Sequence, residues 1–165
     1  MSAATTTERS LLTALLAELA AGAPVAVGVD LTHIPSVCER LARLGPRWLG
    51  DQFTVRELRE LDSVRNGGHA TLAGRLAAKE AFIKLLTPQD DFVLHRDIEI
   101  LRASGGAPVV HAHRSALAAA GRRALTSWSV SITHQGDWAA AVAVGAPALP
   151  APGPVHTHHT QEKRS

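Results

Sequence analysis

The sequence predicts an α+β fold in which an antiparallel sheet packs with helices. Stretches with helical spacing of leucine and alanine alternate with short apolar stretches that have the period of strands. The last two strand-like stretches are separated only by Gln135 to Asp137, which indicates a hairpin and therefore antiparallel pairing. A chain of 165 residues, 45% of them hydrophobic, has the size and composition of one globular domain.

An N-terminal helix is the first expected element. Residues 9–21 carry leucines at helical spacing, and Gly22 and Pro24 then end the helix. We therefore expect residues 1–24 to form a helical extension and residues 25–145 to form the main domain.

A strand and a second helix follow. The apolar, β-branched stretch from Val25 to Asp30 predicts a strand, and apolar residues spaced at helical intervals predict a helix from Ile34 to Leu44. Gly45 and Pro46 are expected to end this helix. Asp30 then lies at the junction, where a carboxylate by itself favours the start of a helix.

Two more helices occupy the middle of the chain. Thr54 to Glu57 has the capping-box pattern that begins a helix. Asn66 to Gly68 interrupts the chain, and the alanine-rich segment from Leu72 to Leu86 predicts a further helix that Pro88 terminates.

The C-terminal half changes to the period of strands. Alternating apolar residues on both sides of Gly105 and Gly106 predict a first hairpin. A helix from Arg114 to Leu125 precedes a second hairpin, whose strands are expected at Trp128 to His134 and Trp138 to Val144.

Two smaller expectations concern the same region. Trp128 and Trp138 lie on the two strands of the second hairpin, and both are expected in the core. Residues 146–165 are rich in Pro and Ala and then polar, with several histidines, so we expect a disordered tail.

The composition excludes several classes of protein. Lys and Arg exceed Asp and Glu by only 17 to 15, which does not favour a nucleic-acid-binding protein. No apolar stretch approaches the roughly 20 residues of a membrane span. Cys38 is the single cysteine and permits no internal disulfide, so we expect a cytoplasmic protein with no membrane association.

The predicted helix from Leu72 to Leu86 carries the most informative charges. Arg75 and Lys79 are one helical turn apart, as are Glu80 and Lys84. One interpretation is a solvated charged face with an intrahelical Glu80–Lys84 pair. The other is a site for a negatively charged partner such as a phosphate, beside a divalent cation held by the carboxylate.

Three separated pieces of the sequence favour the second interpretation. They are the strand that ends in Gly28-Val29-Asp30, the helix segment LAGRLAAKEAFIK that ends at Lys84, and the strand VSITH that ends at His134. In this order and spacing they resemble the holo-acyl-carrier-protein synthase family of 4′-phosphopantetheinyl transferases. The resemblance extends over residues 25–145 and includes the helix that follows Thr54 and the Gly-Gly-x-Pro hairpin.

The resemblance implies a fold, a reaction and an assembly. The fold is that of the 4′-phosphopantetheinyl transferases, assembled as a homotrimer with the active sites between subunits. The reaction moves the 4′-phosphopantetheine arm of coenzyme A to a serine of an acyl or peptidyl carrier protein, with Mg²⁺, and releases adenosine 3′,5′-bisphosphate. Such a phosphoryl transfer depends on neutralising phosphate charge and on placing the hydroxyl in line.

The resemblance also implies roles at the reacting phosphate. By position, Asp30 and Glu80 match the family's Mg²⁺ ligands. Lys84 matches the lysine beside the metal, where it either stabilises phosphate charge or handles the serine proton. These three residues are the expected catalytic group.

Further residues are implied for the coenzyme. Arg75 and Lys79 are candidates for the phosphates of coenzyme A, and Lys84 is a third. His134 matches a histidine near the nucleotide end, although a lone histidine at a strand end is often only a turn residue.

The sequence departs from the family pattern at two places. Residues 87–91 replace a loop that usually carries glycine near the coenzyme, and Ser36 stands where many members have a basic residue. Carrier docking would then use Arg40, Arg43 and Arg47 instead. The alternative function is a catalytically idle homologue that binds carrier protein or coenzyme A.

Overall fold

The computed structural model describes residues 25–62, 68–86 and 92–148. The expected N-terminal helix, the loop from Thr87 to Asp91 and the C-terminal tail lie outside the described residues, so their structure stays a prediction.

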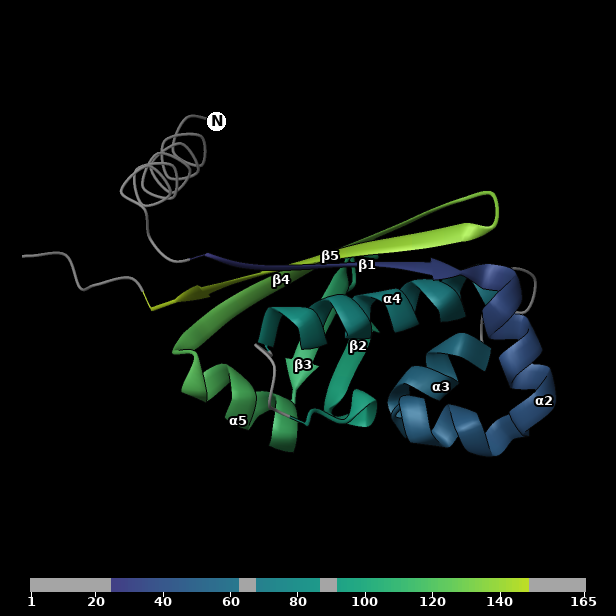
Figure 1. The fold of residues 1–165 in the computed structure, drawn as a ribbon, viewed down its shortest axis with the longest axis horizontal. Helices are drawn as coiled ribbons and strands as arrows, with labels where there is room; N and C mark the ends of the chain where they lie inside the picture. The colour runs from purple at the N-terminus through teal and green to yellow at the C-terminus, as the bar shows by residue number, and fades with distance from the viewer. Residues whose placement is uncertain (1–24, 63–67, 87–91, 149–165) are drawn as a thin grey trace, which may run out of the picture.

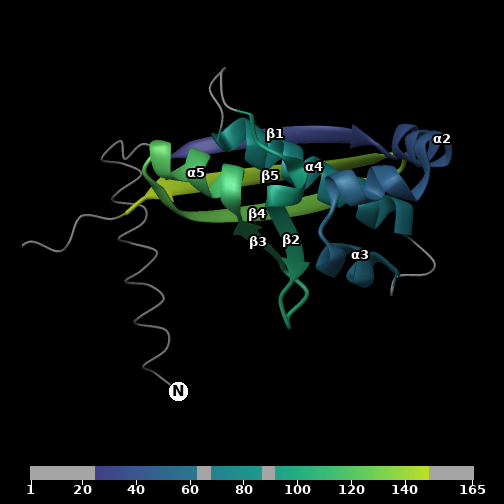
Figure 2. The ribbon, with the colours of Figure 1, turned by 90° about the horizontal axis from the view of Figure 1, so that it is seen from below.

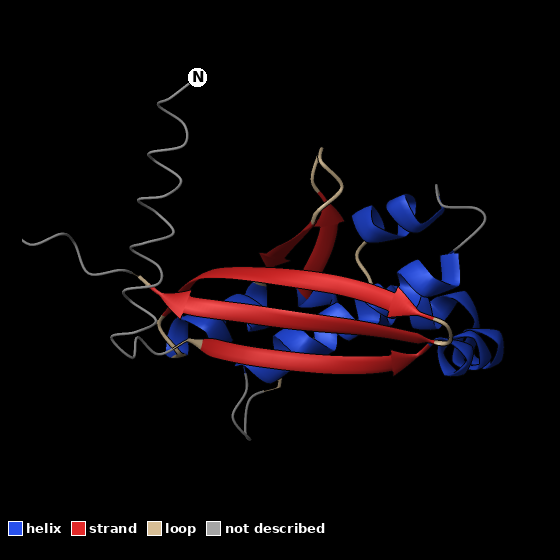
Figure 3. Ribbon diagram, turned by 90° about the horizontal axis from the view of Figure 1, so that it is seen from above, coloured by secondary structure: helices blue, strands red, loops and turns tan. Residues whose placement is uncertain are grey.

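A three-stranded antiparallel sheet forms one layer of the molecule (Figures 1 and 3). Strand β5 (Trp138–Pro147) lies between β1 (Ala26–His33) and β4 (Leu125–Gln135). The expected antiparallel sheet and its C-terminal hairpin are confirmed. The strands are longer than predicted: β1 continues past Asp30, so this residue lies within the strand and not at the start of a helix.

Helix α4 (Gly68–Leu86) runs along one face of this sheet and forms the centre of the core (Figure 1). Its apolar side is fully buried, as expected. Its buried apolar residues include Ala77, Ala78, Ala81, Phe82 and Leu85. The helix also buries Arg75 and Lys79, so the interpretation of a solvated charged face is wrong for these two residues. It begins four residues before the predicted start at Leu72.

Helices α2 (Ile34–Gln52) and α3 (Val55–Asp62) pack at one end of α4 (Figures 1 and 2). Gly45, with a φ of 68°, breaks α2 at the predicted place, but Pro46 begins a second helical segment there. The capping box of α3 is confirmed: the Thr54 amide donates to Glu57 Oε2 at 2.8 Å, and the Glu57 amide donates to Thr54 Oγ1 at 3.2 Å.

A small hairpin, a short 3₁₀ helix and one more helix complete the layer beneath the sheet. The 3₁₀ helix η1 (His95–Asp97) leads into β2 (Ile98–Arg102), which pairs with β3 (Pro108–Ala112) as expected. Helix α5 (Arg114–Arg122) follows and ends before the predicted Leu125, because that residue begins β4.

The two hairpin tryptophans have different environments. Trp128 is partly buried, lies edge-on to Phe82 with ring centroids 5.6 Å apart, and donates from Nε1 to the Val110 carbonyl at 3.1 Å. Trp138 is 47% exposed and lies against the His33 ring at 4.8 Å, so its expected place in the core is wrong. Its position beside the turn at the end of the sheet explains the exposure.

All described helices and the small hairpin lie on one side of the three-stranded sheet (Figures 1 and 3). The other face of the sheet carries exposed apolar side chains on its first and central strands. They are Val27, Val29, Leu31, Val142 and Val144, with exposed fractions between 39% and 60%. No described element of the chain covers this face.

Candidate functional site

The site is built where β1 and α4 touch. A Cβ atom on Gly28 would lie 1.9 Å from the Ala81 carbonyl oxygen, so only glycine permits this direct backbone contact. Asp30 follows Gly28 on the same face of β1 and lies beside Lys84, one turn after Ala81. The close approach of the two backbones therefore brings residues from distant parts of the sequence together.

Lys84 and Asp30 form an ion pair at the edge of the sheet. Lys84 Nζ lies 2.8 Å from Asp30 Oδ1 and also donates to the Val29 carbonyl at 3.1 Å. The second carboxylate oxygen of Asp30 accepts a hydrogen bond from Thr32 Oγ1 at 2.9 Å. The Lys84 side chain remains 53% exposed, so its ammonium group is accessible to a ligand.

Glu80 has a different partner from the one that the helical spacing suggests. His95 Nε2 lies 2.8 Å from Glu80 Oε1, whereas Lys84 forms its ion pair with Asp30. The hydrogen bond from His95 lowers the pKa of the Glu80 carboxyl; burial and the nearby Asp30 carboxylate oppose the shift, and Lys84 supports it. Glu80 is therefore a carboxylate at neutral pH.

The carboxylates share one pocket. A cavity of about 490 Å³ is lined by Asp30, Glu80 and His95, and by residues at the start and end of α2. The latter include His33, Ser36, Arg40, Trp48 and Gln52. Ser36 Oγ is within hydrogen-bond distance of His33 Nδ1 at 2.9 Å. The pocket thus joins the two expected metal ligands to the helix expected to meet the carrier.

The donor set fits a hard divalent cation. Asp30 and Glu80 offer carboxylate oxygens, and among the described residues no three His, Cys, Asp or Glu side chains are placed to share a metal. Two carboxylates with the remaining positions left to water and phosphate is the coordination that Mg²⁺ favours. Both carboxylates line the same pocket, and the Asp30 carboxylate acts to raise the pKa of Glu80 against the stronger effect of His95.

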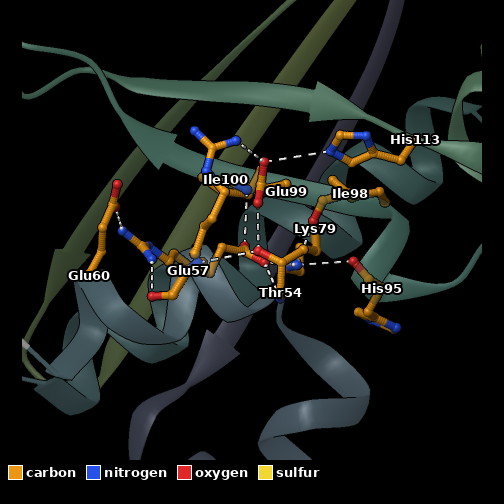
Figure 4. A network of polar contacts seen from close by, with 11 residues as sticks. Thr54, Glu57, Glu60, Lys79, His95, Ile98, Glu99, Ile100 and His113 are labelled. Carbon is orange, nitrogen blue, oxygen red and sulfur yellow. Dashed lines mark hydrogen bonds and ion pairs between the residues drawn. The ribbon is translucent and has the colours of Figure 1, made fainter.

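Lys79 does not lie in this site. Its side chain is fully buried, and Nζ donates to Glu57 Oε2 at 2.9 Å and to the carbonyls of His95 and Ile98 (Figure 4). Burial lowers the pKa of Lys79 to about 8, although Glu57 opposes the shift. An ammonium group with these partners is not available to a coenzyme, so the expected phosphate-binding role of Lys79 is corrected to a structural one.

Arg75 is also engaged in the fold, but its side chain reaches a second pocket. The guanidinium donates to the Glu57 carbonyl at 2.9 Å and forms an ion pair with Glu60, and the side chain is 4% exposed. This pocket of about 220 Å³ is lined by Arg75, Arg102 and His134 and by residues of the β2–β3 turn. Arg102 was not predicted, because a single arginine at a strand end has no distinguishing pattern.

One chain does not bring all the predicted residues together. Arg75 and Glu80 are separated by about 140° around α4 at 100° per residue. Asp30 lies on edge strand β1 and His134 on the opposite edge strand β4, with β5 between them. Two groups therefore lie on opposite flanks of α4. One is formed by Asp30, Glu80 and Lys84, and the other is the pocket lined by Arg75 and His134.

Comparison with known proteins agrees with this architecture. A family model described as the 4′-phosphopantetheinyl transferase superfamily matches residues 26–143, which contain all six predicted site residues. The chain belongs to this superfamily.

The superfamily assignment is supported by relatives with a named activity. A holo-[acyl-carrier-protein] synthase of Desulforudis audaxviator is 36% identical over 118 residues, which cover 72% of this chain and 89% of the relative. A holo-[acyl-carrier-protein] synthase of Mycobacterium tuberculosis is 37% identical over 130 residues, which cover 73% of this chain and 95% of the relative. The expected enzyme class, a holo-[acyl-carrier-protein] synthase of the phosphopantetheinyl transferase superfamily, is confirmed by these relatives.

Solved structures of the superfamily share the fold. The ACPS–CoA complex of Chronobacterium ammoniagenes superposes with a TM-score of 0.65 at 31% identity and covers 76% of this chain and 99% of the relative. The acyl carrier protein synthase of Mycobacterium tuberculosis has a TM-score of 0.57 at 37% identity. The match covers 74% of this chain and 97% of the relative. Within the described residues, no helix is both long and apolar enough for a membrane span.

Proposed function

We propose that this member of the 4′-phosphopantetheinyl transferase superfamily transfers the 4′-phosphopantetheine arm of coenzyme A to a carrier-protein serine, with Mg²⁺. Adenosine 3′,5′-bisphosphate is the second product. The observation that carries the proposal is an open pocket lined by Asp30 and Glu80, with Lys84 paired to Asp30, in a chain of this superfamily. The coenzyme A bound to a structural relative supports the choice of donor.

Asp30 and Glu80 would hold the magnesium ion. When bound, the ion would neutralise charge on the pyrophosphate that breaks during transfer. The carboxylates come from a strand and a helix in direct backbone contact, so their separation is fixed by the fold. This rigidity suits a reaction whose catalysis is mainly positioning and charge stabilisation.

Lys84 would supply positive charge beside a bound ion. In the present arrangement Nζ donates hydrogen bonds to Asp30 and to the Val29 carbonyl. A lysine that acts as a hydrogen-bond donor to a carboxylate is suited to stabilising phosphate charge rather than to removing a proton. We assign it the first of the two roles that the sequence left open.

The nucleotide end of coenzyme A is assigned to the second pocket. Arg75, Arg102 and His134 line it, and their nitrogen atoms suit phosphate oxygens. Because this pocket and the carboxylates lie on opposite flanks of α4, one coenzyme would be held between two copies of the chain. The proposed assembly is therefore a homo-oligomer, and a homotrimer is the form implied by the family resemblance.

The open face of the sheet supports an oligomer. Val27, Val29 and Leu31 on β1 lie beside Val142 and Val144 on β5, and all five are exposed in the single chain. A contiguous apolar face of this kind is typical of a protein interface. A second copy of the chain is the proposed occupant.

The carrier is proposed to dock along α2. Arg40, Arg43 and Arg47 are exposed on this helix, and Arg40 also lines the pocket of the carboxylates. An acidic carrier surface would complement these charges and would bring its serine toward Asp30 and Glu80. A cytoplasmic location remains a prediction from the single cysteine.

The test is a transfer assay with intact mass measurement. The protein, coenzyme A, Mg²⁺ and an apo carrier protein should yield a carrier heavier by one phosphopantetheine arm. Glu80→Ala should abolish the mass shift and retain the fold, because Glu80 contacts a pocket and not the apolar core. Binding of coenzyme A with no shift on fatty-acid, polyketide and peptide carriers would overturn the transferase proposal in favour of an idle homologue.

A further inference from the structure

His95 connects the buried interior to the proposed metal site. It is the first residue of η1, and its side chain is 25% exposed at the pocket that Asp30 and Glu80 line. The imidazole Nε2 lies 2.8 Å from Glu80 Oε1. Since a carboxylate only accepts hydrogen bonds, Nε2 carries the hydrogen and donates it.

Hydrogen bonds from the interior fix the backbone at His95. Its carbonyl accepts a hydrogen bond from Lys79 Nζ at 3.0 Å, and Lys79 is anchored by its ion pair with Glu57 (Figure 4). The preceding residue, Leu94, donates its amide to Ser115 Oγ at 3.2 Å and accepts from the Asp97 amide at 2.9 Å. These bonds fix the position from which the imidazole reaches Glu80.

We propose that His95 is a positioning residue for the Glu80 carboxylate. The inference deepens the proposed function, because it rests on Glu80 being a cation ligand. A glutamate side chain has several rotatable bonds, and a hydrogen bond to Oε1 restricts the carboxylate while Oε2 stays available to the ion. In this role His95 acts through Glu80.

The geometry separates this role from direct ligation. Among the described residues His95 does not join Asp30 and Glu80 in a set of three that could share a metal. Its Nε2 is already occupied as a donor to Glu80. The interaction needs no positive charge on the imidazole, because a neutral ring that carries its hydrogen on Nε2 makes the same bond.

The test compares three substitutions at His95. In His95→Gln the amide nitrogen takes the approximate place of Nε2 and can still donate to Glu80, whereas the shorter side chain of His95→Asn cannot reach. His95→Phe keeps a ring without a donor. We expect His95→Asn and His95→Phe to weaken cation binding about tenfold, which is the lower end of the effect of removing a hydrogen-bond partner of a metal ligand. His95→Gln should retain most of the wild-type affinity.

Cation affinity is measured directly on the full-length protein by titration with Mn²⁺, followed by electron paramagnetic resonance, with and without coenzyme A. His113→Phe is the matched control, because His113 lies 48% exposed and 3.6 Å from Glu99, outside the site. Thermal unfolding of each variant is recorded in parallel. The proposal would be overturned if His95→Phe had the Mn²⁺ affinity of the wild type, or if His95→Gln bound Mn²⁺ as weakly as His95→Asn.

The outcomes also separate this inference from the proposed function. If the wild-type protein binds Mn²⁺ through Glu80 but transfers nothing, the transferase proposal fails and the role of His95 stands. If the wild type transfers phosphopantetheine and His95→Asn has the same Mg²⁺ requirement and the same rate, only the role of His95 fails. A loss of stability in His95→Asn with unchanged Mn²⁺ affinity would reduce His95 to a purely structural contact.

Discussion

Lys79 and Lys84 lie five residues apart on helix α4, yet the first side chain is fully buried and the second is 53% exposed. Lys79 points into the space between α3 and β2, where it forms an ion pair with Glu57. Lys84 points to the edge strand β1 and pairs with Asp30. One helix therefore uses one lysine to hold the fold and one at the candidate site.

Removal of the buried lysine should destabilise the protein. In Lys79→Met the Glu57 carboxylate keeps its bonds from the Thr54 and Ile100 amides but loses its cation. Breaking a buried pair from one side costs about 3 kcal/mol or more. Urea unfolding of the variant and the wild type measures the difference, and equal midpoints would contradict the assigned role.

Removal of the exposed Lys84 should leave stability nearly unchanged and impair transfer. Lys84→Met should change the free energy of unfolding by less than about 1 kcal/mol, since exposed ion pairs contribute little. Transfer to the carrier should fall at least about 100-fold, because a charge at the reacting phosphate is lost. The mass-shift assay and urea unfolding on the same preparation check both parts; a destabilised but fully active variant would exclude the assignment.

Stability should depend on alkaline pH through Lys79. Its pKa is lowered to about 8 in the folded protein, whereas an unfolded lysine keeps its proton to a pH above 10. Between these values the unfolded chain binds more protons, so the free energy of unfolding gains a positive contribution as pH rises. The chain has no tyrosine and only one cysteine, which limits other titrations in this range.

The measurement is the pH dependence of unfolding from pH 7.5 to about 10. The stability difference between wild type and Lys79→Met should grow with pH over this interval. Lys84→Met controls for the loss of a lysine charge. A difference that stays constant or shrinks with pH would show that Lys79 is not held with a lowered pKa.

The contact between β1 and α4 should tolerate only glycine. Gly28→Ala places a methyl group against the Ala81 carbonyl and should destabilise the fold by about 3 kcal/mol, the upper end of overpacking effects. Gly50→Ala is the matched control, because a Cβ there meets nothing within 4 Å and alanine favours the helix. Thermal unfolding should separate the two, and similar melting temperatures would argue against direct backbone contact.

A site shared between two copies should permit complementation. Glu80→Gln removes a carboxylate on one flank of α4 and His134→Ala removes a nitrogen ligand on the other. Each variant alone should be inactive, and co-expressed copies should recover about a quarter of the wild-type rate if mixing in a symmetric oligomer is random. Absence of recovery in verified mixed oligomers would place the whole site in one chain.

The apolar sheet face provides the control for this experiment. Val29→Asp on both variants should prevent recovery, because it introduces a charge at the proposed interface. Val55→Asp, at a valine that is 65% exposed on α3, should leave recovery intact. Size-exclusion chromatography with light scattering would report the oligomeric state of each protein.

Local patterns in the sequence predicted much of the architecture. The capping box at Thr54, the chain break at Gly45 and both hairpins were recognisable because each depends on residues that are neighbours in the chain. The order of three motifs was sufficient for the family. These features need no knowledge of what packs against them.

The environments of individual charges could not be predicted in this way. Helical spacing paired Glu80 with Lys84, but in the fold Glu80 is hydrogen-bonded to His95 and Lys84 forms an ion pair with Asp30. The same spacing grouped Arg75 with Lys79 as phosphate ligands, although Lys79 is enclosed by Glu57 and two backbone carbonyls. A lone histidine such as His95 carries no sequence signal.

The sequence by itself determined the α+β fold class, the superfamily and the residue types available for phosphoryl transfer. Tertiary structure decided which lysine serves the fold, which histidine meets Glu80 and on which flank of α4 each group lies. The physical reason is that burial and ion pairing depend on distances between segments far apart in the chain. The contact of Gly28 with Ala81 sets one such distance, and with it the place of Asp30 beside Lys84.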